Sequence, residues 1–172
     1  MHRLHLLRHA KASRDDDMSD KPRPLSRRGR ETARRIGETL PAALDSIDLV
    51  LCSSSLRTRE TAELALAAFP ATPQILFEDV LYLASHRVLL RRLRLLDETI
   101  GAVLVIGHNP GLHELAVALA EPSSPLYAML AEGKFPTSAR ASFTIAGPWN
   151  ALAEGNVPLA AYVTPRDLGL LD

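Results

Sequence analysis

Residues 102–106, Ala-Val-Leu-Val-Ile, are the part of the chain that most narrows its possible folds. All five are apolar, and a strand without a polar face must be covered by other elements on both sides. Strands of this kind are typical of central positions in parallel sheets, which carry helices on both faces. The sequence Gly-His-Asn-Pro-Gly at 107–111 ends the run abruptly. The run therefore predicts an α/β protein with a buried central strand.

Shorter apolar runs alternate with segments of helical periodicity along the rest of the chain. From Ser26 to about Leu44 apolar residues recur at helical spacing, and Ser26 is a suitable N-cap. The same reasoning predicts strands at 2–7, 47–52, 74–77, 141–145 and 160–163, and helices at 56–69, 85–96, 112–119 and 126–130. Residues 13–25 are polar and interrupted by prolines, which predicts a loop. This alternation predicts a three-layer sandwich with a largely parallel central sheet flanked by helices.

Length and composition are those of an ordinary globular protein. The 172 residues are 47% hydrophobic and 23% charged, and we expect one domain over residues 1–172. Twenty basic and twenty acidic residues give a formal net charge of zero, which argues against a nucleic-acid or membrane-surface partner. No segment approaches the ~20 apolar residues of a membrane-spanning helix.

The cysteine content and the first residues bear on the cellular compartment. Cys52 is the only cysteine, so no intrachain disulfide is possible. It ends an apolar run, which favours a buried strand residue over a nucleophile. Arg3, Arg8 and Lys11 interrupt the first twelve residues, so no signal peptide is indicated. We therefore expect a cytoplasmic protein.

Polar side chains follow three of the predicted strands. Arg8 and His9 come after the first strand, Arg57 lies shortly after the second, and His108 and Asn109 follow the central strand. Ligands of such sheets bind beyond the carboxyl ends of the strands, where these side chains would meet. Guanidinium groups bind phosphate oxygens bidentately, and an imidazole can attack phosphorus. The pattern predicts a site that binds and transfers a phosphoryl group without a metal or other cofactor.

The same residues resemble the signature of the histidine phosphatase superfamily. Residues 7–10, Leu-Arg-His-Ala, are similar to its Arg-His-Gly/Ala motif, and residues 53–62 to its second block. Residues 105–109 resemble the block with the second histidine, and residues 23–29 the segment before the first long helix. These blocks occur in the family's order over about residues 3–120. The short chain is most similar to SixA-type phosphohistidine phosphatases, and the resemblance implies the phosphoglycerate mutase-like fold.

The resemblance also implies roles for the polar residues at the strand ends. His9 would become transiently phosphorylated, while Arg8, Arg57 and His108 would bind the phosphoryl oxygens. Asn109 is a further phosphate-binding candidate. For His9 to attack through one ring nitrogen, an acceptor must hold the other, and we expect a backbone carbonyl that the sequence does not identify.

The chain departs from the larger family members at the proton donor. Those members place a glutamate after the third strand, at a position that falls here on or near Leu83. Glu78 and Asp79 are nearby substitutes, and the carboxylates of residues 15–17 are a second possibility. Because a protonated imidazole leaves readily and an alkoxide does not, the missing glutamate favours phosphohistidine over sugar phosphates as substrate.

For several other charged and aromatic residues a structural role is the simpler interpretation. Arg59 points to a different helix face from Arg57, which favours a surface role, whereas Lys11 is equally compatible with lining the pocket or not. The remaining histidines are expected to be structural or exposed: His2, His5, His86 and His113. The basic residues Arg91, Arg92 and Arg94 fit the solvated face of a helix, or a contact with an acidic partner.

Three hypotheses for function follow. The first is a phosphatase that forms a phosphohistidine intermediate on His9 and removes phosphate from phosphohistidine on a phosphotransfer or phosphocarrier protein, releasing inorganic phosphate. The second is a phosphomonoesterase or mutase that acts on a small phosphorylated metabolite. The third is a non-catalytic module that binds phosphorylated ligands.

Overall fold

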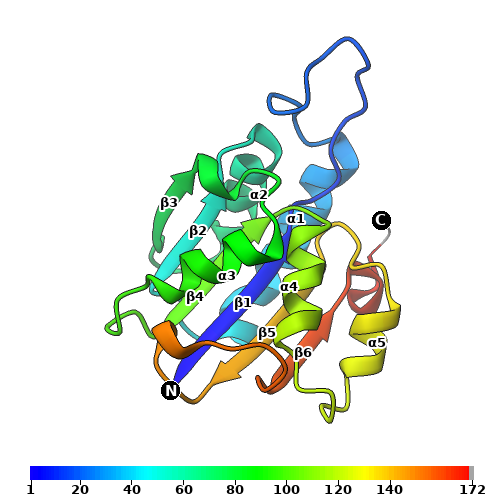
Figure 1. Ribbon diagram of the computed structural model, residues 1–172. Helices are drawn as coiled ribbons and strands as arrows, with labels where there is room; N and C mark the ends of the chain where they lie inside the picture. The colour runs from blue at the N-terminus through cyan, green and yellow to red at the C-terminus, as the bar shows by residue number, and fades with distance from the viewer. Residues whose placement is uncertain (171–172) are drawn as a thin grey trace.

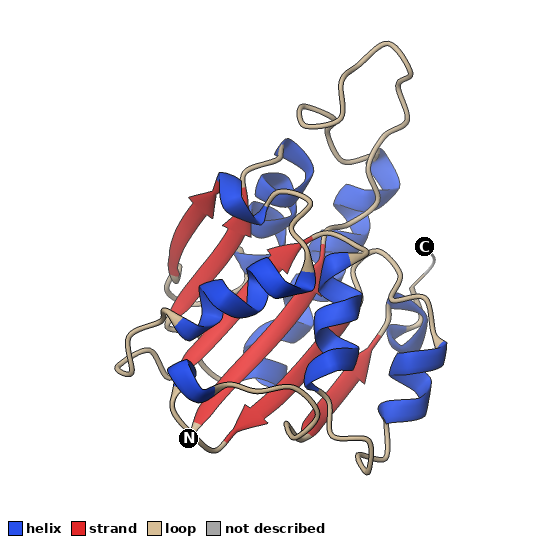
Figure 2. Ribbon diagram, in the orientation of Figure 1, coloured by secondary structure: helices blue, strands red, loops and turns tan. Residues whose placement is uncertain are grey.

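The computed structural model describes residues 1–170 and shows one six-stranded sheet between two layers of helices (Figure 1, Figure 2). The strands are β1 (His2–Arg8), β2 (Leu49–Ser53), β3 (Gln74–Glu78), β4 (Ala102–Gly107), β5 (Arg140–Ile145) and β6 (Leu159–Val163). The helices are α1 (Arg27–Leu44), α2 (Leu56–Leu66), α3 (His86–Arg94), α4 (Gly111–Leu119) and α5 (Tyr127–Glu132). Three short 3₁₀ helices, η1 (Asp79–Leu81), η2 (Trp149–Ala151) and η3 (Pro165–Leu168), were not predicted. The predicted three-layer α/β architecture is confirmed.

The strand order is β3-β2-β4-β1-β5-β6. The neighbours β3, β2, β4 and β1 are parallel, whereas β5 is antiparallel to both β1 and β6. The sheet is therefore largely parallel, as predicted, with one reversed strand. Strand β4 lies between β2 and β1, which confirms its predicted central position.

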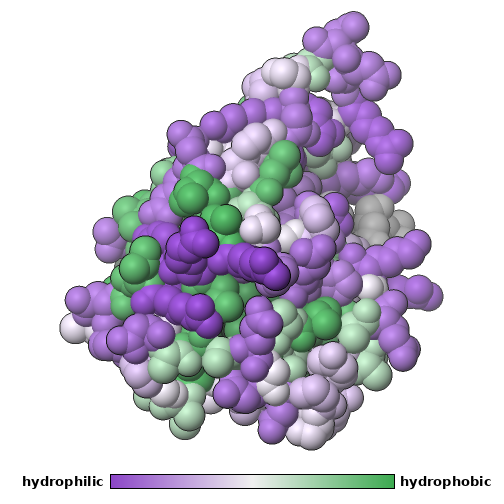
Figure 3. All heavy atoms as spheres, viewed as in Figure 1, coloured by the Kyte–Doolittle hydropathy of each residue, from purple (hydrophilic) through white to green (hydrophobic). Residues whose placement is uncertain are grey.

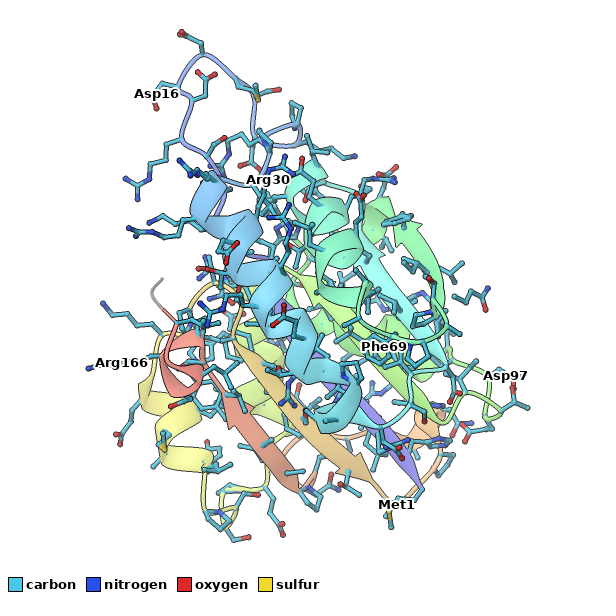
Figure 4. All side chains as sticks on the ribbon, turned by 180° about the vertical axis from the view of Figure 1, so that it is seen from behind. Met1, Asp16, Arg30, Phe69, Asp97 and Arg166 are labelled. Carbon is cyan, nitrogen blue, oxygen red and sulfur yellow. The ribbon has the colours of Figure 1, made fainter. Side chains whose placement is uncertain are left out.

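Alternating side chains of β4 supply both hydrophobic cores. Val103 and Val105 belong to the core with the leucines of α3 and α4, and Leu104 and Ile106 to the core with α1 and α2. Figure 1 shows α3 and α4 in front of the sheet, and Figure 4 shows α1 on the opposite face. All four side chains are buried, as expected for a strand covered on both faces.

Serine caps start the helices that flank the site. The hydroxyl of Ser26 accepts a hydrogen bond from Gly29 N at the start of α1, and Ser55 accepts one from Thr58 N at the start of α2. Helix α2 ends at Leu66 and not at the predicted residue 69, because the backbone tightens into a turn ahead of Pro70. Each cap fixes the first turn of its helix at the carboxyl edge of the sheet.

The predicted loop at 13–25 extends beyond the edge of the sheet at which β1 ends (Figure 1). Its surface is hydrophilic in Figure 3, and Asp16 lies near its far tip in Figure 4. The base of the loop is closed by a bridge between Ala12 and Leu25 and by a hydrogen bond from Ser13 N to Pro24 O. Within residues 1–170, no helix has the length and apolar character needed to cross a membrane.

Candidate active site

The predicted site residues follow three adjacent strands. Arg8 of β1 is in register with Gly107 of β4, and Cys52 of β2 with Ile106 of β4. The chain segments after these strands therefore leave the sheet at the same edge. This register brings His9, Arg57 and His108 together, as the sequence predicted.

His9 is buried, with 7% of its surface exposed, and its ring orientation is defined. Its Nδ1 lies 2.7 Å from the carbonyl oxygen of Ala10, so Nδ1 carries the proton and donates it. The carbonyl that the sequence could not identify is therefore that of Ala10. Ala10 N in turn donates to Thr61 Oγ1 of α2 at 3.0 Å, which holds this turn against the helix. The arrangement leaves Nε2 of His9 without a proton and available for attack.

His108 lies beside His9, with 5.3 Å between the ring centroids. Its Nδ1 is 3.3 Å from a terminal nitrogen of Arg57, and its Nε2 is 2.7 Å from Ser53 Oγ. Since the guanidinium can only donate, Nδ1 is the acceptor, and neutral His108 carries its proton on Nε2. Ser53 and Arg57 thus fix the ring from both sides.

Arg57 and Arg8 supply the positive charge of the pocket. Arg57, in the first turn of α2, is 3% exposed, and Arg8 donates to the carbonyl oxygen of Phe135 at 3.2 Å. The Nε atoms of both guanidinium groups are buried without a hydrogen-bond partner. Burial and the neighbouring Arg57 lower the pKa of Arg8. Two guanidinium groups, each with a buried and unused Nε donor, are suited to an oxyanion.

Burial also keeps both histidines neutral. Burial is the main cause that lowers the pKa of His9 to about 3, with the positive potential of His108, Arg8 and Arg57 acting in the same direction and the Ala10 hydrogen bond opposing it. Burial and then Arg57 lower the pKa of His108 to about 4. A neutral imidazole is the nucleophilic form, so His9 is ready to react at neutral pH.

Two residues of the pocket, Asp20 and Tyr82, were not predicted from the sequence. A carboxylate oxygen of Asp20 and its backbone carbonyl each accept a hydrogen bond from Arg57 at 3.0 Å. The Tyr82 hydroxyl donates to the same carboxylate, and its ring stands edge-on to His108 at 5.5 Å. The only signal in the sequence was the position of Asp20 three residues before Arg23. The Arg23 guanidinium also donates hydrogen bonds to the Asp20 carboxylate. A loop contact of this kind has no periodicity that a sequence would show.

Asn109 makes a different contact from the one expected. Its side-chain amide donates to the carbonyl oxygens of Lys134 and Phe135, at 3.3 and 2.9 Å. The remaining side-chain oxygen can only accept hydrogen bonds and is unsuited to a phosphate oxygen. Asn109 therefore positions the segment whose Phe135 carbonyl also binds Arg8, and direct phosphate binding by Asn109 stays a prediction.

The candidate proton donors are engaged in other interactions. Glu78 forms a bidentate pair with Arg92, at 2.7 and 3.0 Å. Hydrogen bonds from Lys21 and then Ser54 lower the pKa of Asp79. Residues 15–17 are exposed in the projecting loop. The lowered pKa of Asp79 favours its ionised form, which does not donate a proton, and the Glu78 carboxylate is held by Arg92.

The other polar residues have the structural or surface settings expected of them. Arg59 donates to Ser54 O and lies 4.2 Å from the Phe77 ring centroid, away from the Arg57 donors. The backbone of Lys11 anchors Ser26, while its side chain is exposed. The histidines outside the pocket contact Glu98 and Trp149 (His2), Ser142 (His5), Glu114 (His86), and Leu130 O and Phe135 (His113).

Cys52 is buried in β2, as expected, and burial raises the pKa of its thiol to about 12. In the predicted basic cluster Arg92 pairs with Glu78 and Arg94 donates to Leu152 O, which leaves Arg91 exposed. Within the described part of the chain, no three His, Cys, Asp or Glu side chains gather in a way that could hold a metal ion.

Comparisons with known proteins identify the family. Residues 4–79 match the family model of the histidine phosphatase superfamily, branch 1. A protein of uncharacterized function from Mycobacterium tuberculosis is 34% identical over 163 residues, which cover 93% of this chain and 100% of the relative.

Solved structures of SixA proteins share the whole fold. A protein from Nakamurella multipartitia, provisionally assigned as the phosphohistidine phosphatase SixA, superposes with a TM-score of 0.82 at 28% identity, over 95% of this chain and 96% of that one. The protein histidine phosphatase SixA complexed with tungstate gives a TM-score of 0.78 at 26% identity, over 96% and 99% of the two chains. The chain therefore belongs to branch 1 of the histidine phosphatase superfamily and is SixA-like.

Proposed function

We propose that this histidine-type phosphatase removes phosphate from phosphohistidine on a protein, by way of a phosphohistidine intermediate on His9 and without a metal. The observation that carries the proposal is the His9 ring, which donates from Nδ1 to Ala10 O and directs an unprotonated Nε2 into a pocket with Arg8, Arg57 and His108. The SixA relatives support the same substrate class. A cytoplasmic location, where phosphotransfer proteins and reduced thiols such as Cys52 occur, belongs to the proposal.

In the first step, His9 Nε2 forms a bond to phosphorus and the bond from phosphorus to the substrate imidazole breaks. The departing electron pair stays on that imidazole, which leaves as a neutral group if its other nitrogen already carried a proton. Arg8 and Arg57 compensate the charge of the equatorial oxygens. Because Nδ1 of His9 remains protonated and bonded to Ala10 O, the phosphorylated ring is cationic and reactive.

In the second step, water attacks phosphorus, the bond to His9 Nε2 breaks, and inorganic phosphate leaves after losing a proton to solvent. His108 contributes to both steps when it is protonated. A bound phosphoryl dianion favours the imidazolium form of His108, in which a proton on Nδ1 faces a phosphoryl oxygen and replaces the hydrogen bond accepted from Arg57. Ser53 keeps the ring in place during this change.

The carboxylates at the pocket favour phosphohistidine over an alkyl ester. Hydrogen bonds from Tyr82 and Arg57 lower the pKa of Asp20 to about 2, and Glu78 and Asp79 are held by basic partners. None of the three suits the protonation of an alkoxide, whereas an imidazole needs no such donor.

Exposed basic residues at and before the start of α1 suit an acidic protein partner. Five exposed basic residues near the start of α1 have no acidic partner among the described residues: Lys11, Arg14, Arg27, Arg34 and Arg35. Lys11 lies two residues after His9 and is anchored to α1 through Ser26. Unpaired positive charge on α1, whose start is fixed to the chain two residues beyond His9, would attract and orient an acidic phosphoprotein.

The test compares substrates and surface variants. We expect the protein to hydrolyse a phosphohistidine peptide at least a hundredfold faster, in kcat/KM, than an alkyl phosphate. Charge reversal at Arg34 and Arg35 should lower kcat/KM for an acidic phosphohistidine protein about tenfold at low salt and leave the rate with a small phosphohistidine unchanged. Arg91→Glu on α3 is the control for a change of charge elsewhere.

Other outcomes would favour the alternative functions. Faster hydrolysis of an alkyl phosphate than of phosphohistidine would contradict the proposal in favour of a small-molecule phosphomonoesterase. Tight binding of phosphorylated ligands without turnover of any would favour a binding module.

A further inference from the structure

One donor of Arg57 is occupied by an anion that belongs to the chain itself. One terminal nitrogen of Arg57 donates to Asp20 O and the other to Asp20 Oδ2, both at 3.0 Å. The second of these nitrogens also faces His108 Nδ1 at 3.3 Å. A guanidinium has five N–H groups, so at least three of those on Arg57 are already engaged. A phosphoryl group that approaches the two terminal nitrogens of Arg57 competes with Asp20 for their donors.

The Asp20 carboxylate is bound in the way a small oxyanion would be. Its Oδ2 accepts hydrogen bonds from Arg57 and from the Tyr82 hydroxyl, and its Oδ1 accepts two from Arg23, at 3.2 and 3.0 Å. Among the described residues, Asp20 is the only acidic partner of Arg57, and Arg8 has none. The carboxylate therefore neutralises one of the two guanidinium groups of the pocket.

Asp20 can also leave without disturbing the core. Its side chain is 44% exposed, whereas that of Arg57 is 3% exposed. It belongs to the projecting loop, whose neighbouring Lys21 contacts the body of the protein through Leu56 N and Asp79. Displacement of the carboxylate therefore requires a change in an exposed loop and not in a packed element.

We propose that Asp20 is an internal competitor of the phosphoryl group: it neutralises Arg57 in the free protein, keeps weakly bound anions out of the pocket, and returns to Arg57 as phosphate leaves. The inference rests on the proposed phosphoryl-binding role of Arg57. It differs from a positioning role for Asp20, in which the carboxylate would hold Arg57 in the geometry that phosphate needs. The two roles predict opposite effects of removing the carboxylate charge.

The test is calorimetric titration of inorganic phosphate into wild type and Asp20→Asn at constant ionic strength. We expect Asp20→Asn to bind phosphate about tenfold more tightly, the effect of losing one charge-assisted competitor. Asp16→Asn, which removes one charge from the same loop at a site that does not contact Arg57, should change the affinity less than twofold. Melting curves of all variants test whether each is folded.

Tyr82→Phe provides an independent second variant. It removes one of the donors that hold Asp20 without altering any charge, and it should tighten phosphate binding about threefold. Equal or weaker phosphate binding by Asp20→Asn and Tyr82→Phe would overturn the inference, as would the absence of phosphate binding by every form. The titration measures no turnover, so an error in the proposed substrate would not change its result.

Discussion

Three histidines of this chain are buried in settings that disfavour their charged form. Burial is the main cause that lowers the pKa of His5 to about 4, of His9 to about 3 and of His108 to about 4, and nearby arginines act in the same direction. For His5, the next contribution comes from Arg140, which is itself buried in β5. The neutral rings are stabilised by hydrogen bonds to Ser142, Ala10 and Ser53, in that order.

These histidines predict that the protein loses stability in mildly acidic solution. In the unfolded chain they take up protons below about pH 6.5, whereas in the folded protein they stay neutral down to about pH 4. The free energy of unfolding should therefore fall as the pH is lowered from about 6.5 to 4. At pH 5 it should be lower than at pH 7 by roughly 1–2 kcal/mol per histidine. Urea unfolding at pH 7 and pH 5 measures the difference.

Replacement of one buried histidine tests whether these histidines cause the loss of stability at low pH. His5→Asn, which is remote from the phosphoryl pocket, should reduce the difference in unfolding free energy between pH 7 and pH 5. A wild-type free energy that is the same at both pH values would contradict the burial of neutral histidines.

At the scale of elements, the position of α1 depends on a close approach to the segment after β1. A Cβ atom at Gly29 would lie 2.0 Å from the backbone oxygen of Lys11, so only glycine fits there. The same oxygen accepts hydrogen bonds from Ser26 N and Ser26 Oγ. Helix α1 is thus fixed to the chain two residues beyond His9.

This contact predicts a strong effect of Gly29→Ala. In an isolated helix, alanine is more stable than glycine by about 1 kcal/mol. Here the alanine Cβ atom would clash with the Lys11 oxygen and force the helix away from it. We expect a net loss of about 2 kcal/mol and a melting temperature lower by roughly 4–8 °C. Gly147→Ala is the control, because nothing lies within 4 Å of its Cβ. Equal melting temperatures for both variants would refute the argument.

At the scale of the whole molecule, the sequence predicted what periodicity and hydrophobicity determine. The continuous apolar run of β4 and the capped, amphipathic α1 were found almost to the residue, because burial sets their patterns. The reversal of β5 was not predicted, since the two directions of a buried strand have the same side-chain pattern. The three 3₁₀ helices are too short to have a period.

The same distinction separates the features of the candidate site that the sequence could predict from those that it could not. That His9, Arg57 and His108 lie together could be predicted, because their residue types stand in motifs at or shortly after the ends of predicted strands. The Ala10 carbonyl could not be identified, because every residue has a carbonyl group. The Asp20 contact depends on the path of a loop through space, and the sequence gives no measure of that path.

The most direct measurement is to trap the phosphorylated protein during turnover of labelled phosphohistidine and to locate the label by mass spectrometry. The account predicts one phosphoryl group on His9, stable in alkali and lost in acid, and no label on His9→Ala although that variant still binds phosphate. A label on another residue, an acid-stable label, or turnover by His9→Ala at the wild-type rate would contradict it.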